Sequence, residues 1–263
     1  MFTEKDIPPT LFKYRSWDDP YHKRLLTHCE LYFASFDQFN DPFDGAVPFK
    51  YDQEQLTKEN IFLKMYEVAK HQNPDWDDKQ IHAYCYEHQR RGYLLDEQYV
   101  ESLQEDIRTK TNSRFGIVSL AELPNNYLLW SHYSSSHTGF CVGFNSRKLF
   151  DATKGMLGPV SYQHDLPLID LFGDEIEFGR KLLFTKGKHW EYEDEYRLVR
   201  PGYSRKKAYL PLEVFECLVF GYKMDQKDKF SILELLEEKH PNVTIYEAKL
   251  STSKFELDLI PIK

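Results

Sequence analysis

The residues best suited to chemistry lie in the stretch 189–200, where carboxylates, aromatic rings and arginines are interleaved. The second half of this stretch alternates polar and apolar residues, which predicts a strand. Side chains two positions apart lie on the same face of a strand, so we expect Glu193, Glu195 and Arg197 to project together. Ionisable groups on a half-buried strand cost free energy unless they are paired or bind a ligand. The sequence therefore predicts a functional site here, with structural ion pairing of Glu195 and Arg197 as the alternative.

Two other groups of polar and aromatic residues have side chains that bind nucleotides in many proteins. Tyr14 and Arg15 end an apolar segment read as an early strand, and residues 130–137 follow a predicted helix start. An arginine can hold a phosphate by paired hydrogen bonds, and an aromatic ring can stack on a planar base. The alternatives are that Arg15 is a structural clamp for Asp41 or Asp44, and that the rings of 130–137 belong to the core.

The acidic residues also allow a metal-dependent nuclease as a third hypothesis. Asp41, Asp44, Glu193 and Glu195 would supply metal ligands if the loop around Asp41 folded over the strand. The net charge of −8 and the pI near 5.7 argue against bulk binding to nucleic acid or to an anionic membrane. The histidines have no standard metal-ligand spacing, so we assign no metal site.

The cysteines and the apolar segments indicate the cellular compartment. The four cysteines are widely spaced and form no C-x-x-C pair, so neither a zinc site nor a disulfide framework is indicated. The first residues lack the basic start and apolar run of a signal peptide. No apolar run reaches the roughly 20 residues that cross a bilayer. We therefore expect a cytoplasmic protein without a membrane partner.

The order of the predicted elements indicates an α+β fold with mostly antiparallel strands. Strands are expected at 11–15, 31–35, 115–120 and 140–144, and again from 160 to the end of the chain. A helical insertion is expected at 53–112 within a single domain, 1–263. Helix starts are expected at Asp19-Pro20 and at Asn126, and a further helix is expected at 174–186. The helix expected at 225–240 has Phe230, Leu233 and Leu236 at inward spacing, with Leu235 as an alternative.

Four short words of sequence are shared with one known family. They are Lys13-Tyr14-Arg15; Leu31-Tyr32-Phe33 with Phe39-Asn40-Asp41-Pro42-Phe43-Asp44; Leu129-Trp130-Ser131-His132-Tyr133 with His137-x-Gly139-Phe140-Cys141-x-Gly143-Phe144; and Trp190-x-x-Glu193-x-Glu195-Tyr196-Arg197. Through these words the chain resembles the domain-of-unknown-function 2971 family of bacterial proteins. The resemblance implies kinship and no particular reaction.

More distantly, the chain resembles the ADP-ribosyltransferases, which carry an early Arg or His, a middle Ser or Tyr and a late Glu-x-Glu. Here Arg15, then Ser131 or Tyr133, then Glu193-x-Glu195 occur in that order, although no Ser-Thr-Ser word is present. The resemblance implies a split sheet with an inserted helical subdomain, and NAD as the substrate. A carboxylate beside the ribose would stabilise the positive charge that develops as nicotinamide leaves.

The same resemblance assigns roles to individual residues. Glu195 would be the catalytic carboxylate, Glu193 its positioning partner, and Tyr133 a ring beside nicotinamide. The expected nucleotide-binding residues are Arg15, Tyr14, Asn40, Trp130, Ser131, His132 and Arg197. The protein would then be a toxin or defence effector that uses a small-molecule nucleotide and an unidentified acceptor. The alternative is a non-catalytic nucleotide- or protein-binding module.

Overall fold

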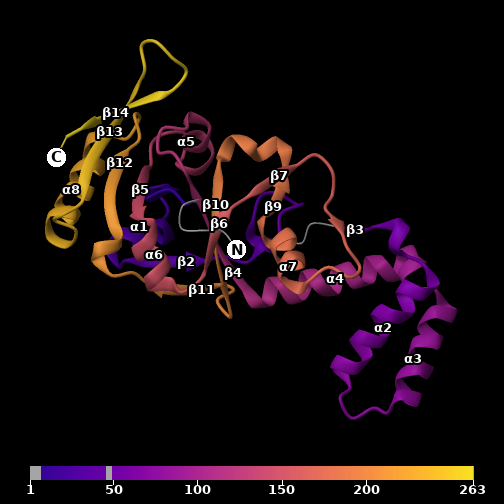
Figure 1. Cartoon of the computed structure of the whole chain (residues 1–263). Coiled ribbons are helices and arrows are strands. Elements are labelled where there is room, and N and C mark those ends of the chain that lie inside the picture. Colours follow the sequence, from indigo (N-terminus) through magenta and orange to yellow (C-terminus); the bar gives the residue numbers. More distant parts are fainter. Residues whose placement is uncertain (1–6, 46–48, 263) are drawn as a thin grey trace.

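An eight-stranded sheet forms the centre of the molecule in the computed structural model, which describes residues 7–45 and 49–262 (Figure 1). Its strand order is β14-β13-β12-β5-β1-β4-β10-β6. Neighbouring strands are antiparallel except β12 and β13, which are parallel and joined through helix α8. The predicted α+β class with mostly antiparallel strands is confirmed.

The strands of this sheet, in chain order, are β1 (Thr10–Arg15), β4 (Phe115–Ala121), β5 (Phe140–Asn145), β6 (Met156–Pro159), β10 (Glu195–Pro201), β12 (Phe215–Phe220), β13 (Thr244–Leu250) and β14 (Leu257–Pro261). Shorter strands pair as β2 (Glu30–Phe33) with β11 (Lys206–Tyr209), β3 (Lys50–Tyr51) with β8 (Leu168–Ile169), and β7 (Ser161–Gln163) with β9 (Thr185–Gly187). The α-helices are α1 (Pro20–Thr27), α2 (Lys58–Gln72), α3 (Asp78–Arg91), α4 (Glu97–Arg114), α5 (Tyr127–Tyr133), α6 (Ser146–Thr153), α7 (Glu175–Phe184) and α8 (Gln226–Lys239). Short 3-10 turns are η2 (Phe36–Gln38), η3 (Gln53–Gln55), η4 (Tyr93–Leu95), η5 (Lys188–Glu193) and η6 (Leu212–Val214).

Each face of the sheet packs against its own set of helices. On one face, the strands share a hydrophobic cluster with α1, α6 and α8, in which Leu26, Leu149 and Leu236 are buried. On the other face, α5 and α7 cover smaller clusters that include Trp130 and Leu183. Alternation along a strand decides which face each side chain joins. None of the helices in the described part of the chain is long and apolar enough to span a bilayer.

The sheet parts between two neighbouring strands in its interior, β1 and β4. Strand β1 pairs with β5 over its whole length, and β4 pairs with β10 over its whole length. Within these two fully described strands, a single register pair, Phe12 with Ala121, joins β1 to β4. Side chains from both faces of the sheet therefore meet where the strands separate.

Local sequence signals explain the elements that border this gap. Asp19 accepts hydrogen bonds from the backbone amides of Tyr21 and His22, and Pro20 opens α1, as the sequence predicts. Asn126 caps α5 in the same way through the amides of Leu128 and Leu129. These caps fix where the two helices begin.

The helices of the predicted insertion project away from the sheet. Helices α2 and α3 pack as a hairpin, and α4 runs from this hairpin back to β4 (Figure 1). Ile81 and Cys85 of α3 are buried against Ala69 of α2, in a cluster separate from the clusters of the sheet. That 53–112 forms an insertion within one domain stays a prediction.

Three local predictions differ from the structure. Glu193 ends the turn η5 rather than continuing β10, because Asp194 has a left-handed backbone with φ of 43°. The helix expected to reach Lys186 ends at Phe184, and Lys186 lies on β9. In α8, Leu236 is buried and Leu233 packs against the same cluster, as predicted, but Phe230 is 62% exposed and Ile232 is buried instead.

The separate cluster of the hairpin predicts independent unfolding. The substitution Ile81→Asp places a carboxylate in this cluster and should cost about 3 kcal/mol or more locally. We expect α2 and α3 to lose amide-exchange protection while the strands β4, β5 and β10 keep theirs. Ala83→Asp, on the exposed side of α3, is the matched control and should leave the hairpin protected. Loss of protection throughout the sheet would show instead that the hairpin and the sheet unfold together.

Candidate functional site

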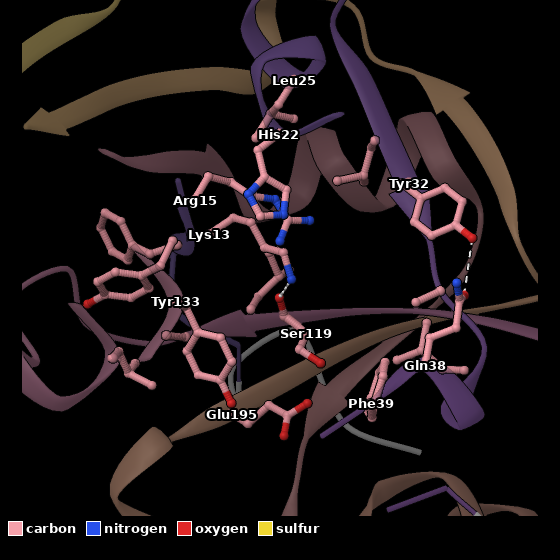
Figure 2. A pocket seen from close by; sticks show the side chains of 18 of the residues that line it. Lys13, Arg15, His22, Leu25, Tyr32, Gln38, Phe39, Ser119, Tyr133 and Glu195 are labelled. Carbon is pink, nitrogen blue, oxygen red and sulfur yellow. Dashed lines mark hydrogen bonds between the residues drawn. The ribbon is translucent and has the colours of Figure 1, made fainter. Parts of the chain in front are cut away.

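A cavity of about 790 Å³ lies at the parting of the sheet (Figure 2). Lys13 and Arg15 of β1 line one side of it, and Tyr133, Glu193 and Glu195 line another. Lys13 and Arg15 alternate with Tyr14 and so face the α1 side of the sheet, whereas Glu195 faces the α5 and α7 side. The cavity joins the two faces because the strands part there, and its volume is typical of small-molecule sites.

A buried ion-pair network forms the acidic end of the cavity. Arg197 is fully buried, and its Nη2 donates to both carboxylate oxygens of Asp44, at 2.6 and 2.7 Å. Its Nε donates to Glu195 Oε1 at 2.9 Å, and its Nη1 donates to the carbonyl oxygen of Leu183 at 2.8 Å. The guanidinium therefore joins the loop before β3, the end of α7 and the start of β10. The predicted alternative of a Glu195–Arg197 ion pair is confirmed.

Lys186 is the second cation of this network. Its Nζ donates to Glu193 Oε2 at 2.6 Å and to Glu195 Oε2 at 3.1 Å, and lies 3.8 Å from Asp44 Oδ2. The hydroxyl of Tyr133 donates to the other oxygen of Glu193 at 2.7 Å. The two glutamates are thus brought together by Lys186 despite the turn at Asp194.

Burial and pairing act in opposite directions on the ionisation of this network. Burial alone would raise the pKa of Glu195, but Arg197 and Lys186 outweigh it and lower that pKa to about 2. Burial would lower the pKa of Lys186, but Glu195, Glu193 and Asp44 raise it. Burial and the charge of Glu195 raise the pKa of Asp44 despite Arg197. Three carboxylates face two cations, which leaves the fully ionised network with one excess negative charge.

The opposite end of the cavity is cationic, and the charge of Asp19 acts on Arg15 from beyond ion-pair distance. Lys13 Nζ donates to the carbonyl oxygen of Ser119 at 2.5 Å, across the gap between the strands. Arg15 has no hydrogen bond or ion pair within residues 7–45 and 49–262. Burial lowers the pKa of Arg15 to about 10, so it stays charged at neutral pH. Burial and the charge of Arg15 lower the pKa of His22 to about 4, so that ring is neutral.

The unpaired guanidinium is the strongest sign of a missing ligand. A charge removed from water costs free energy unless a counter-charge is nearby. At the acidic end, the protein supplies the counter-charges itself. At the end that contains Arg15, the described residues supply only the more distant charge of Asp19, so an anion in direct contact with Arg15 would be stabilised there.

The structure brings most of the sequence-predicted site residues to this cavity. Seven of them line it: Tyr14, Arg15, Asn40, His132, Tyr133, Glu193 and Glu195. Their functional roles stay predictions. Tyr14 is itself 4% exposed and donates its hydroxyl to the carbonyl oxygen of Leu123, so its main contribution is packing.

Three predicted binding residues do not line the cavity. Trp130 is fully buried, and its Nε1 donates to the carbonyl oxygen of Pro124, which makes it a core residue. Ser131 is exposed and absent from the cavity lining. Arg197 lies behind Glu195, and its guanidinium is engaged in ion pairs with Asp44 and Glu195. Binding roles for these three find no support in the cavity, because Trp130 and Ser131 do not line it from the short helix α5 and the guanidinium of Arg197 already binds Asp44 and Glu195.

Two alternative hypotheses also lose their structural basis. Arg15 is not a clamp for Asp41 or Asp44, because Asp44 pairs with Arg197 and Asp41 accepts a hydrogen bond from the backbone amide of Phe43. The nuclease hypothesis needs several free acidic ligands at one point. Among the described residues, no group of three or more histidines, cysteines and carboxylates is placed to hold a metal ion.

The sequence reasoning missed Lys13, His22, Ser119 and Lys186 as residues of the cavity. Lys13 could have been found, since it lies two positions before Arg15 on the same strand face. Lys186 carried no sequence signal, because its meeting with Glu193 and Glu195 depends on the pairing of β7 with β9 and on the turn η5.

The comparison with known families confirms one of the two resemblances. Residues 129–198 match the model of the family described as "Protein of unknown function (DUF2971)". This segment contains Tyr133, Lys186 and both glutamates, but neither Lys13 nor Arg15. Searches among curated proteins and among solved structures found no match. The resemblance to ADP-ribosyltransferases stays a prediction.

The central position of Arg197 predicts a large stability loss on its removal. Arg197→Met leaves Asp44 and Glu195 buried with fewer counter-charges and should lower the free energy of unfolding by about 3–5 kcal/mol. Arg180→Met is the matched control, because it removes an arginine that pairs with Glu177 at an exposed position. It should cost about 1 kcal/mol or less. Urea denaturation compares the two variants, and equal losses would contradict a structural role for the network.

The lowered pKa of Glu195 predicts a defined pH dependence. A carboxyl group ionises more readily in the folded than in the unfolded protein when its folded pKa is depressed. The stability that Glu195 contributes is therefore complete above its ordinary pKa of 4.5 and is lost as the pH falls towards about 2. We expect the difference in unfolding free energy between wild type and Glu195→Gln to shrink across this window. Asp44 acts in the opposite sense in both proteins, and a difference that does not change with pH would contradict the prediction.

Proposed function

We propose that the protein is an ADP-ribosyltransferase-like enzyme that uses NAD. The observation that carries the proposal is the unpaired Arg15 guanidinium in the same cavity as the carboxylates of Glu193 and Glu195. NAD offers matching charges, because it joins an anionic pyrophosphate to a cationic nicotinamide ribose. The size of the cavity, about 790 Å³, supports a ligand of this class.

Each end of the cavity suits one part of this substrate. Arg15 would hold the pyrophosphate by charge-assisted hydrogen bonds, with Lys13 beside it. The ring of Tyr133, fixed by its hydrogen bond to Glu193, would lie beside nicotinamide. Asn40 and His132 would complete the walls.

The chemistry would depend on fixed negative charge rather than on proton transfer by Glu195. The bond between ribose and nicotinamide breaks, the bonding electrons leave with nicotinamide, and positive charge develops on the sugar. The excess negative charge of the network would stabilise this charge, with Glu195 as the catalytic carboxylate and Glu193 as its positioning partner. An acceptor or water then attacks the sugar carbon.

A second candidate is a non-catalytic nucleotide-binding module. It is favoured by one observation: Arg197 and Lys186 already bind the two oxygens of Glu195. Such pairing weakens the charge that Glu195 can offer to a transition state. Both candidates require an anionic ligand at Arg15, and they differ only in whether nicotinamide is released.

Nicotinamide release and thermal stabilisation by NAD together separate these candidates. For wild type we expect saturable stabilisation and release of nicotinamide. Arg15→Gln should weaken NAD binding by about 10- to 100-fold, because it removes charge-assisted hydrogen bonds. Glu193→Gln should lower the release rate more than the affinity. Glu247→Gln, which also removes a lysine-paired carboxylate but lies outside the cavity, should change neither.

The outcomes lead to different conclusions. Binding without release would support the module and reject the enzyme. No stabilisation by NAD in a protein that melts cooperatively would reject the enzyme and favour a module that binds another nucleotide. Loss of release in Glu195→Gln would not by itself assign catalysis to Glu195, because the substitution also breaks a buried ion pair.

All four cysteines are unpaired, which suits the proposed cytoplasmic location of the protein. In the cell, the proposed enzyme would act as a toxin or defence effector.

A further inference from the structure

We propose that Lys13 is a carbonyl-reactive amine, which forms an imine with a phosphorylated aldehyde or ketone whose phosphate is held by Arg15. The inference does not need NAD chemistry, and neither the mechanism above nor the confirmed family segment assigns a reaction to Lys13. Three observations support it: Lys13 lines the cavity, its side chain has no ion pair with any described residue, and the Arg15 guanidinium lies beside it.

The geometry places an amine and an anion site side by side in one cavity. Lys13 and Arg15 are two positions apart on β1 and extend from the same face into the cavity (Figure 2). Both side chains are partly accessible to solvent. A ligand whose phosphate contacts Arg15 therefore has its neighbouring atoms within reach of the Lys13 amine.

Lys13 differs from Lys186, the other lysine deep in this cavity. Lys186 lies against three carboxylates and is 5% exposed, so its lone pair is occupied by a proton. The side chain of Lys13 has a single hydrogen bond, to the backbone carbonyl of Ser119, and no ion pair in the part of the chain that the structure describes. A carbonyl oxygen can also accept this hydrogen bond from the neutral amine, because the neutral amine keeps two N–H donors.

The charges around Lys13 favour its neutral form. Adjacent cations repel each other, and lysine gives up its proton far more readily than arginine. Burial, and then the charge of Arg15, hold the pKa of Lys13 well below its usual range. Glu195 and Glu193 act in the opposite direction, but they are paired with Arg197 and Lys186. His22, on α1, is neutral and adds no charge.

The proposed reaction balances without an oxidant or reductant. The lone pair of the neutral amine attacks the carbonyl carbon and forms a C–N bond. The carbonyl oxygen leaves as water with the two protons of the amine, and a C=N bond remains. If the imine takes up a proton from solvent, its N–H can keep the hydrogen bond to the Ser119 carbonyl.

Pyridoxal 5′-phosphate is a suitable probe, because it carries both an aldehyde and a phosphate. The whole protein is incubated with low concentrations of this compound, the imine is reduced with borohydride, and the modified lysines are identified by peptide mapping. We expect Lys13 to be labelled first and saturably, and Lys186 to stay unlabelled. Inorganic pyrophosphate should compete for Arg15 and slow the labelling of Lys13.

Variants separate the amine from the anion site. Lys13→Arg keeps a cation but removes the primary amine, so the saturable label should disappear. Arg15→Gln should reduce labelling about tenfold or more, and pyridoxal without phosphate should label the wild type about tenfold more weakly. Lys229→Arg, which changes a lysine outside the cavity, should not alter the label.

The mapping on wild type decides the matter even if Lys13→Arg folds poorly. Labelling confined to exposed lysines in proportion to probe concentration, or equal labelling of Lys13 and Lys186, would overturn the proposal. Labelling of Lys13 that pyridoxal matches and pyrophosphate does not affect would overturn the role of Arg15. Because nicotinamide release is measured separately, failure of the NAD proposal would leave this result interpretable.

Discussion

The need to balance charge away from water governs the arrangement of this site. At one end of the cavity, Arg197 and Lys186 neutralise most of the charge on Asp44, Glu193 and Glu195. These contacts join a loop, the strand β9, the turn η5 and the strand β10, so the network stabilises the fold while it shapes the cavity. At the other end, Arg15 makes no ion pair with any described residue, and Asp19 acts on it only from a distance. The asymmetry means that the protein completes its own ion pairs on the acidic side and leaves the basic side for a ligand.

The parting of the sheet is what allows the two ends to share one cavity. Six register pairs hold β1 to β5, and seven hold β4 to β10, so each half of the sheet is firmly built. The single pair between Phe12 and Ala121 joins the halves. In an unbroken sheet, Lys13 and Glu195 would lie on opposite faces and could not act on one ligand.

The two proposals use the same cationic end of the cavity and so exclude each other in time. A phosphorylated carbonyl compound joined to Lys13 would occupy the position that the pyrophosphate of NAD needs beside Arg15. If both occur, the imine would inhibit the use of NAD. The two share the requirement for an anion, and they differ in the second group that acts: the carboxylates in one case and the Lys13 amine in the other.

The sequence by itself determined what depends on neighbouring residues. Alternation and caps predicted the strands and helices, including the starts of α1 at Asp19 and α5 at Asn126, and residue types indicated Arg15, Tyr133 and both glutamates as candidates. It could not decide that Ile232 rather than Phe230 is buried in α8, since several apolar residues compete for the inward positions. The sequence also suggested binding roles for Trp130 and Arg197, but Trp130 packs in the core and the guanidinium of Arg197 is engaged in ion pairs. Only the tertiary structure decided which charges are satisfied, because Asp44, Lys186 and Arg197 come from segments far apart in the chain. That pairing is what distinguishes the free Arg15 from the buried Arg197, two residues that look alike in the sequence.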